Sequence, residues 1–298
     1  MKSMRNAGEL MELLQLPDKI PRPLAVSTMR CPLLGRIHFV RDPKGIMQLL
    51  CVFFYWLYGT FSSLFIIILP RYAEGYISGI FVTAFMSISL LCLTSLVRVS
   101  TLNPGRIPPS TAVSIHENEH WTYCRMCNSM RPQRAHHCRR CGQCVMRMDH
   151  HCPWINNCVG EENHYAFFLL LLYAFLLSAV VFLLCMLHFW VYPKCQQCDK
   201  DTFYVKHSIW FLYLLTLLAA NMTLVMGIQL IGQHFNLLID RTTLENMQQS
   251  PDPSRIHLRS TFTAYEEMCG RKRSMMFLWL FPCKRKTVFS RGVSSQTV

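Results

Sequence analysis

Seven cysteines and four histidines lie within the 35 residues from Cys124 to Cys158, between long apolar runs. Cysteine and histidine are the usual ligands of structural zinc, which takes four of them in a tetrahedron. Two zinc ions would therefore use eight of these eleven groups and leave three free. The segment predicts two metal sites together with three groups that could do chemistry of another kind.

The spacing of these residues favours zinc knuckles, tight turns in which a C-x2-C pair gives one metal two sulfur ligands. Two pairs have this spacing, Cys124 with Cys127 and Cys138 with Cys141. Four later residues can complete the sites: His137, Cys144, His151 and Cys158. A RING-type ubiquitin ligase also interleaves two zinc sites, but its pattern should close on another C-x2-C pair, and this one closes on Cys152-x5-Cys158.

The three groups left over are His136, His150 and Cys152. A thiol becomes a strong nucleophile when a nearby histidine removes its proton. Asp149 precedes His150 and could hold that imidazole in the right tautomer. The run 149–152 therefore offers an acid, a base and a nucleophile for covalent catalysis, and two zinc ions would make this site rigid.

Long apolar segments must position this cluster. Of 298 residues, 51% are hydrophobic, and the mean hydropathy is +0.21. Four segments of more than 20 residues lack Asp, Glu, Lys and Arg and can cross a bilayer as helices: 46–69, 77–97, 165–189 and 209–233. We expect an all-α polytopic membrane protein with four transmembrane helices and a two-zinc cysteine-rich domain between the second and third.

The positive charges predict the orientation of these helices. Of 30 Lys and Arg, eight lie in residues 1–44, eight in 98–164 and ten in 236–298. Because positively charged loops stay in the cytosol, both termini and the cysteine-rich loop are predicted to be cytosolic. The cytosol is reducing, so the cluster should bind metal and not form disulfides. Topology and anionic lipid explain the formal charge of +13, and we expect no nucleic-acid partner.

The chain divides into five predicted segments. They are an extension without expected structure, two spans, the cysteine-rich domain, two spans with a short lumenal loop, and a cytosolic tail: residues 1–35, 36–97, 98–164, 165–235 and 236–298. Cys195 and Cys198 of the lumenal loop have C-x2-C spacing, and they could form a disulfide or remain free thiols.

The cysteine-rich segment resembles the DHHC protein S-acyltransferases, or palmitoyltransferases. The resemblance rests on residues 149–152 within C-x2-C-x9-H-C-x2-C-x2-C-x4-D-H-H-C-x5-C, followed by Asn163 and Phe167. It covers about residues 36–282 and is most specific in the loop. It implies a four-helix membrane bundle whose cavity holds a fatty acyl chain.

The resemblance also implies roles for individual residues. One zinc ion is expected on Cys124, Cys127, His137 and Cys144, and the other on Cys138, Cys141, His151 and Cys158. Cys152 is the expected nucleophile, His150 its general base and Asp149 the acid that orients the base. The implied reaction moves a long-chain acyl group from acyl-CoA to Cys152, and then to a cytosolic cysteine of a membrane-associated protein.

Motifs outside the loop extend the resemblance. Thr242-Thr243-Leu244-Glu245 matches the TTxE box of the family, in which Thr243 is expected to help position Asp149, with Thr242 and Glu245 in supporting roles. Without the resemblance, these residues are an ordinary helix N-terminus. The Asp-Pro-Gly box of the family is Asn103-Pro104-Gly105 here, so any role that needs its charge is in doubt.

Four residues are candidate contacts for acyl-CoA. Arg131, Arg134 and His136 could bind CoA phosphates, and Trp154 resembles the family's aromatic residue at the cavity mouth. A solvated basic face and an interfacial tryptophan are the plainer alternatives.

A non-catalytic, zinc-stabilised membrane adaptor is the competing hypothesis. Asn103 and the triplet 268–270 keep it open, because both depart from the family pattern, whereas intact Asp149, His150 and Cys152 favour the enzyme. The Golgi or endoplasmic reticulum is the expected location, with the plasma membrane as the alternative.

Overall fold

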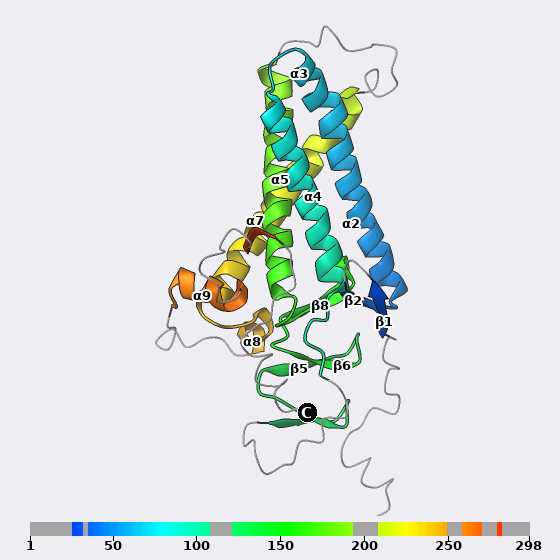
Figure 1. The fold of residues 1–298 in the computed structure, drawn as a ribbon, viewed down its shortest axis with the longest axis vertical. Coiled ribbons are helices and arrows are strands. Elements are labelled where there is room, and N and C mark those ends of the chain that lie inside the picture. The colour runs from blue at the N-terminus through cyan, green and yellow to red at the C-terminus, as the bar shows by residue number, and fades with distance from the viewer. Residues whose placement is uncertain are drawn as a thin grey trace, which may run out of the picture.

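Four long helices, standing side by side, dominate the computed structural model (Figure 1). The structure describes residues 26–31, 35–107, 121–192, 208–248, 258–269 and 279–281. Four helical stretches in these ranges are long and apolar enough to cross a membrane: Pro43–Ala73, Gly79–Thr101, His164–Trp190 and Ile209–Leu238. By length and composition, the four predicted spans are confirmed.

The first stretch is made of α2 (Pro43–Ser62), the π-helical segment η1 (Ser63–Ile68) and α3 (Leu69–Ala73). The other three are α4 (Gly79–Thr101), α5 (His164–Trp190) and α7 (Ser208–Leu238). Asp42 caps α2 by accepting a hydrogen bond from the Lys44 amide, and Pro43 occupies the first turn, where its missing N–H costs nothing. The short helices α8 (Thr243–Gln248) and α9 (Thr261–Cys269) follow α7.

The bundle has apolar cores at both ends and polar ties between helices. The core beside α3 includes Ile67, Phe85 and Leu184, and the core beside the cysteine-rich segment includes Val99 and Phe167. The hydroxyls of Tyr55 and Tyr58 in α2 donate to backbone carbonyls of α7, at 2.8 and 2.7 Å. Such bonds between helices stabilise a bundle in lipid, where packing gains little from the hydrophobic effect.

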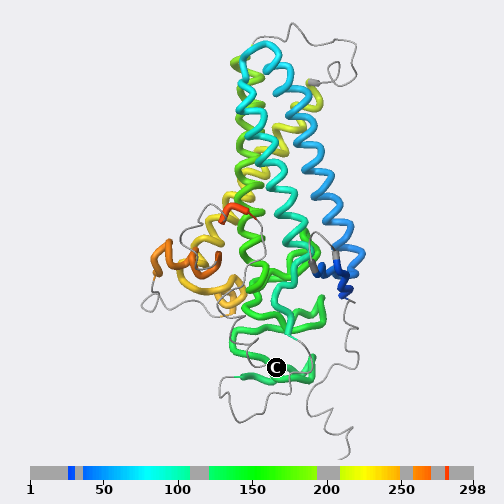
Figure 2. The backbone as a smooth tube through the Cα atoms, in the orientation of Figure 1, coloured from blue at the N-terminus to red at the C-terminus, as the bar shows by residue number. Residues whose placement is uncertain are grey.

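The cysteine-rich segment lies at one end of the bundle, on the same side as α8 and α9 (Figure 2). Three antiparallel hairpins form it: β3 (Thr122–Cys124) with β4 (Ser129–Arg131), β5 (Ala135–Cys138) with β6 (Gln143–Met146), and β7 (His150–Cys152) with β8 (Asn157–Val159). The 3-10 turn η2 (Pro153–Ile155) joins the last pair. The all-α prediction is therefore right for the spans and wrong for this segment, because knuckle turns connect short strands.

A further hairpin precedes α2. The prediction of an unstructured extension over residues 1–35 is wrong for β1 (Val26–Cys31), which pairs with β2 (Gly35–Val40). An isolated hairpin is marginal, but Val26 and Val40 pack on the apolar cluster of the cysteine-rich segment, and this contact stabilises it. Residues 1–25 lie outside the described residues, as do Cys195 and Cys198 with the disulfide question.

Candidate active site and metal centres

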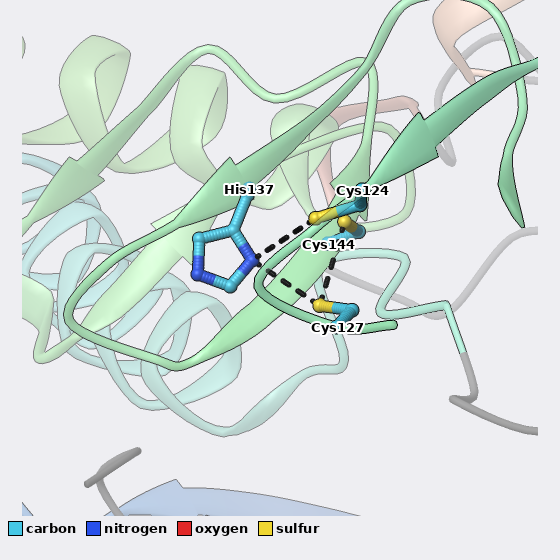
Figure 3. Close-up of side chains that lie close together, drawn as sticks. All are labelled: Cys124, Cys127, His137 and Cys144. Atoms are coloured by element: carbon cyan, nitrogen blue, oxygen red, sulfur yellow. Dashed lines mark hydrogen bonds between the residues drawn. The ribbon is translucent and has the colours of Figure 1, made fainter. Parts of the chain in front are cut away.

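The structure brings together the first predicted zinc set. Its ligand atoms, from Cys124, Cys127, His137 and Cys144, lie within 4.8 Å of one another. His137 Nδ1 lies 3.7 Å from Cys124 Sγ and 3.2 Å from Cys127 Sγ, which is itself 3.7 Å from Cys144 Sγ (Figure 3).

The second predicted set, Cys138, Cys141, His151 and Cys158, has the same geometry. His151 Nδ1 lies 3.7, 3.5 and 3.6 Å from the sulfurs of Cys138, Cys141 and Cys158. With Zn–S bonds of about 2.3 Å and Zn–N bonds of about 2.0 Å, a tetrahedral zinc separates its ligand atoms by roughly 3.5–3.8 Å. Both sets fit zinc. Because protein ligands would fill all four positions, they fit structural and not catalytic zinc.

The three hairpins are repeats of one unit fourteen residues long. Cys124, Cys138 and Cys152 each end the first strand, and Asn128, Gly142 and Asn156 each follow in the turn. These three turn residues all have left-handed backbones, with φ of 50°, 65° and 49°. The cross-strand pairs obey the same repeat: Tyr123 with Met130, His137 with Cys144, and His151 with Cys158.

The repeat explains why one cysteine is spare. Each zinc set combines the knuckle of one hairpin with the cross-strand His–Cys pair of the next. In the third hairpin, Cys152 occupies the position that the candidate metal ligands Cys124 and Cys138 occupy in the other two, but Ile155 occupies the position of the second knuckle cysteine. Cys152 therefore lacks a C-x2-C partner, and it belongs to neither of the candidate metal sets found among the described residues.

Strand β7 separates metal binding from the spare thiol. Successive side chains of a strand point to opposite faces, so His151 faces its zinc set while His150 and Cys152 share the other face. His150 Nδ1 donates to Asp149 Oδ2 at 2.8 Å, and Cys152 is near enough to help raise the pKa of the same ring. Asp149 and Cys152 are buried, at 3% and 7% exposure. The structure thus brings the three predicted catalytic residues together, with a direct hydrogen bond between Asp149 and His150.

The surroundings of Asp149 and His150 shift the pKa values of both side chains. Burial would raise the pKa of Asp149, but hydrogen bonds from His150 and the Thr243 amide, with the nearby His164, hold it well below its usual range. Burial would lower the pKa of His150, yet its hydrogen bond to Asp149 and the nearby Cys152 raise it to about 9. An imidazole with this pKa holds a proton firmly near neutral pH, which favours an imidazolium beside a Cys152 thiolate.

The segment after α7 completes the shell around Asp149. The Thr243 amide and hydroxyl donate to Asp149 Oδ1 and Oδ2, at 2.5 and 3.1 Å. Thr242 and Glu245 form a reciprocal capping box at the start of α8. Glu245 also accepts two hydrogen bonds from the Arg134 guanidinium, at 2.8 and 2.9 Å, which fastens α8 to the cysteine-rich segment.

Apolar side chains from the spans surround Cys152. The buried cluster around it contains Leu96 and Val99 of α4 and Phe167 and Leu171 of α5, with partly buried neighbours from α2 and α7. The Phe167 ring stands edge-on to His150, with centroids 5.4 Å apart. The thiol therefore lies where the cysteine-rich segment meets the interior of the bundle.

Comparison with known proteins agrees with this geometry. Residues 117–250 match the family model of the DHHC palmitoyltransferases. The chain is 38% identical to palmitoyltransferase ZDHHC21 of Bos taurus, over 84% of this chain and 94% of that protein, and 37% identical to human ZDHHC21 over the same shares. It is 31% identical to palmitoyltransferase ZDHHC3 of Rattus norvegicus, over 72% of this chain and 74% of that protein.

The chain belongs to the DHHC palmitoyltransferase family. Membership makes it a protein S-acyltransferase, in keeping with the carboxylate, imidazole and thiol that lie together in residues 149–152. The adaptor hypothesis loses its ground with this result.

In this DHHC palmitoyltransferase, Asn103 replaces the aspartate of the family's Asp-Pro-Gly box and still makes the hydrogen bonds of the turn. Asn103 Oδ1 accepts hydrogen bonds from the Gly105 and Arg106 amides, at 3.1 and 2.9 Å. An aspartate would use the same kind of oxygen for the same turn. Gly105, with φ of 97°, then pairs with Met146 of β6 and so ties α4 to the zinc hairpins. The turn needs an acceptor and not a charge.

The predicted CoA contacts of this palmitoyltransferase fall into two groups. Trp154 is 56% exposed in η2. Arg131 and His136 lie near each other on β4 and β5, where burial and then the Arg131 charge lower the pKa of His136. Arg134 differs, because its guanidinium is engaged by Glu245 and Asp240. Its observed partners make it a tie between segments and not a free phosphate ligand.

Two polar residues of the site were not predicted from the sequence. Gln233 of α7 is 4% exposed and donates to Asp149 Oδ2 at 2.9 Å. His164, the first residue of α5, lies 2.7 Å from Gln233 Oε1 through its Nε2. Both residues stand at predicted span ends, where polar side chains are ordinary. The only sequence signal was that a buried polar residue in a membrane helix is often functional.

Proposed function

We propose that this DHHC palmitoyltransferase forms a thioester between a long-chain fatty acyl group and Cys152, and then passes that group to a cysteine of a membrane-associated protein. The observation that carries the proposal is that the hydrogen-bonded Asp149–His150 pair shares a strand face with the buried Cys152 thiol, which belongs to neither candidate metal set among the described residues. A purely structural zinc knuckle does not require a buried carboxylate such as that of Asp149 beside it.

The first step makes the acyl-enzyme. His150 takes the thiol proton while Cys152 Sγ attacks the carbonyl carbon of acyl-CoA, and Asp149 stabilises the imidazolium that forms. The carbon–sulfur bond to CoA then breaks, and the CoA thiolate leaves with the proton from His150. Cys152 is left as a thioester, with no net change in charge.

The second step returns the enzyme to its start. The thiol of the protein substrate loses its proton to His150 and attacks the Cys152 thioester carbonyl. Cys152 leaves as a thiolate and recovers the proton, so the acyl group has moved from sulfur to sulfur. Zinc, held by the two Cys/His sets, supplies rigidity to the hairpins and takes no part in these steps.

The surroundings of Cys152 suit both parts of acyl-CoA. The apolar cluster from α4 and α5 favours a fatty chain that enters the bundle from the thiol. Arg131 and His136 are proposed contacts for CoA phosphates, with Trp154 at the mouth of the chain's path. Arg134 acts in this proposal by holding Glu245 and α8 in place.

The proposed orientation puts both termini and the hairpins in the cytosol, because 26 of 30 Lys and Arg lie in those segments. There, cytosolic acyl-CoA and protein thiols both reach Cys152. Membranes of the Golgi or endoplasmic reticulum are the proposed location, with the plasma membrane as the alternative. Protease protection of tagged termini in sealed membranes tests the orientation.

The decisive experiment follows the acyl-enzyme. Purified full-length protein with an alkynyl acyl-CoA should form a hydroxylamine-sensitive adduct that Cys152→Ser abolishes and that Cys51→Ser, at an exposed position of α2, retains. A full adduct in folded, zinc-loaded Cys152→Ser would overturn the assignment. Repeated transfer to a cysteine peptide distinguishes the enzyme from an adaptor that acylates itself once.

A further inference from the structure

Gln233 is a buried amide whose hydrogen bonds all converge on the active site. It lies in the last turns of α7 with 4% of its surface exposed. Its Nε2 lies 2.9 Å from Asp149 Oδ2 and 3.3 Å from Thr243 Oγ1, and its Oε1 lies 2.7 Å from His164 Nε2. A buried amide must satisfy its polar atoms, and every bond that it makes here concerns the shell around Asp149.

The chemistry of the neighbours fixes the direction of this amide. An ionised carboxylate only accepts hydrogen bonds, so the Gln233 Nε2 group must face Asp149. The Oε1 atom then faces His164, whose Nε2 must carry a proton to donate to it. The carboxylate therefore sets the direction of the Gln233 amide, and His164, protonated at Nε2, supports that direction.

Asp149 Oδ2 consequently receives donors from three directions: His150 Nδ1, Gln233 Nε2 and Thr243 Oγ1. Of these, Gln233 is the donor that comes from within a spanning helix. His150 turns about its own side-chain bonds, so a carboxylate held at this angle also decides where the imidazole points.

We propose that Gln233 is a positioning residue, supported by His164, that holds the Asp149 carboxylate toward His150 and so couples the packing of α5 and α7 to the reactivity of Cys152. The inference rests on the proposed role of Asp149 as the acid that orients the base.

Two substitutions and a matched control test it in the full-length protein with alkynyl palmitoyl-CoA. Gln233→Met keeps the length of the side chain and removes its donor, and it should slow acyl-enzyme formation at saturating acyl-CoA about tenfold or more. The KM for acyl-CoA and the zinc content should stay unchanged. Gln229→Met, at an exposed glutamine of the same helix, should change none of these quantities.

Gln233→Glu gives a readout that a merely structural role would not move. Ionised, the new carboxylate repels Asp149; protonated, its O–H donates to Asp149 and its carbonyl accepts from His164, as the amide does. The rate relative to the natural protein should therefore rise as the pH falls from about 8 to about 6. The titratable groups around position 233 are Asp149, His150 and His164, which both proteins share, so the ratio removes their common effect.

A natural rate in Gln233→Met, or a rise in KM alone, would overturn the inference, as would a pH-independent ratio for Gln233→Glu. If Gln233→Met fails to fold or loses zinc, the Gln233→Glu ratio decides. Cys152→Ser separates the two proposals: an adduct that survives there defeats the acyl-enzyme itself. An adduct lost there, with unaffected Gln233 variants, defeats only this inference.

Discussion

Replacing Gly45 by alanine should loosen the contact between the first span and the loop that carries Cys152. Gly45 lies buried in the first turn of α2, where an added Cβ would lie 2.2 Å from Asn156 Oδ1 and 2.8 Å from its Cγ. Asn156 cannot easily give way, because its backbone has φ of 49° and its Nδ2 donates to the Val40 carbonyl at 2.8 Å.

The expected magnitude is a balance of two terms. Overpacking of this kind costs about 1–3 kcal/mol. The higher helix propensity of alanine returns up to about 1 kcal/mol, so the net loss of stability should be roughly 1–2 kcal/mol. Gly59 supplies a matched control in the same helix, because a Cβ there meets nothing within 4 Å. Gly59→Ala should therefore hold or slightly raise the melting temperature.

Thermal unfolding in one detergent, together with the rate of Cys152 acylation, measures both effects. Asn156 follows Cys152 by four positions, so the Gly45 variant should also acylate more slowly. Asn156→Gly suits the left-handed backbone and removes the clashing atoms, so adding Gly45→Ala to it should cost almost nothing. Equal melting temperatures for the two alanine variants, or a full Gly45 effect in the Asn156→Gly background, would refute the reasoning.

Three further predictions concern the shell of the site. Cys141→Ser should lower bound zinc to about one ion per chain and reduce yield, whereas Cys152→Ser keeps two, as elemental analysis would show. Thr243→Val removes one donor to Asp149 and leaves the backbone N–H, and acylation should slow about tenfold in a single-turnover assay, with a natural rate as the contrary result. Asn103→Asp should leave activity within about twofold, since either side chain supplies the acceptor, and a larger change would show that charge matters.

Much of the architecture follows from the sequence because its signals are local. Charge-free runs of more than 20 residues predicted the four spans, and their bounds agree to within a few residues, since the bilayer thickness sets helix length. The two Cys/His sets also came together as the family resemblance implied, and the C-x2-C spacing of zinc knuckles had already indicated two pairs of their ligands.

The rest depends on contacts between distant segments. No local sequence pattern in residues 26–40 predicted the hairpin, because its stability comes from packing on the cysteine-rich segment. Arg134 has the residue type of a phosphate ligand, and only the fold brings Glu245 and Asp240 to it. Gln233 and Asp149 stand 84 positions apart, so their hydrogen bond has no signature in either neighbourhood.

In the fourteen-residue repeat, a single position separates the hairpin that carries Cys152 from one with a complete C-x2-C knuckle. The third hairpin differs from a complete knuckle chiefly at Ile155, so a lineage that gained cysteine there would offer Cys152 a thiol partner for metal or oxidation. The site would then be lost while the surrounding scaffold stayed intact.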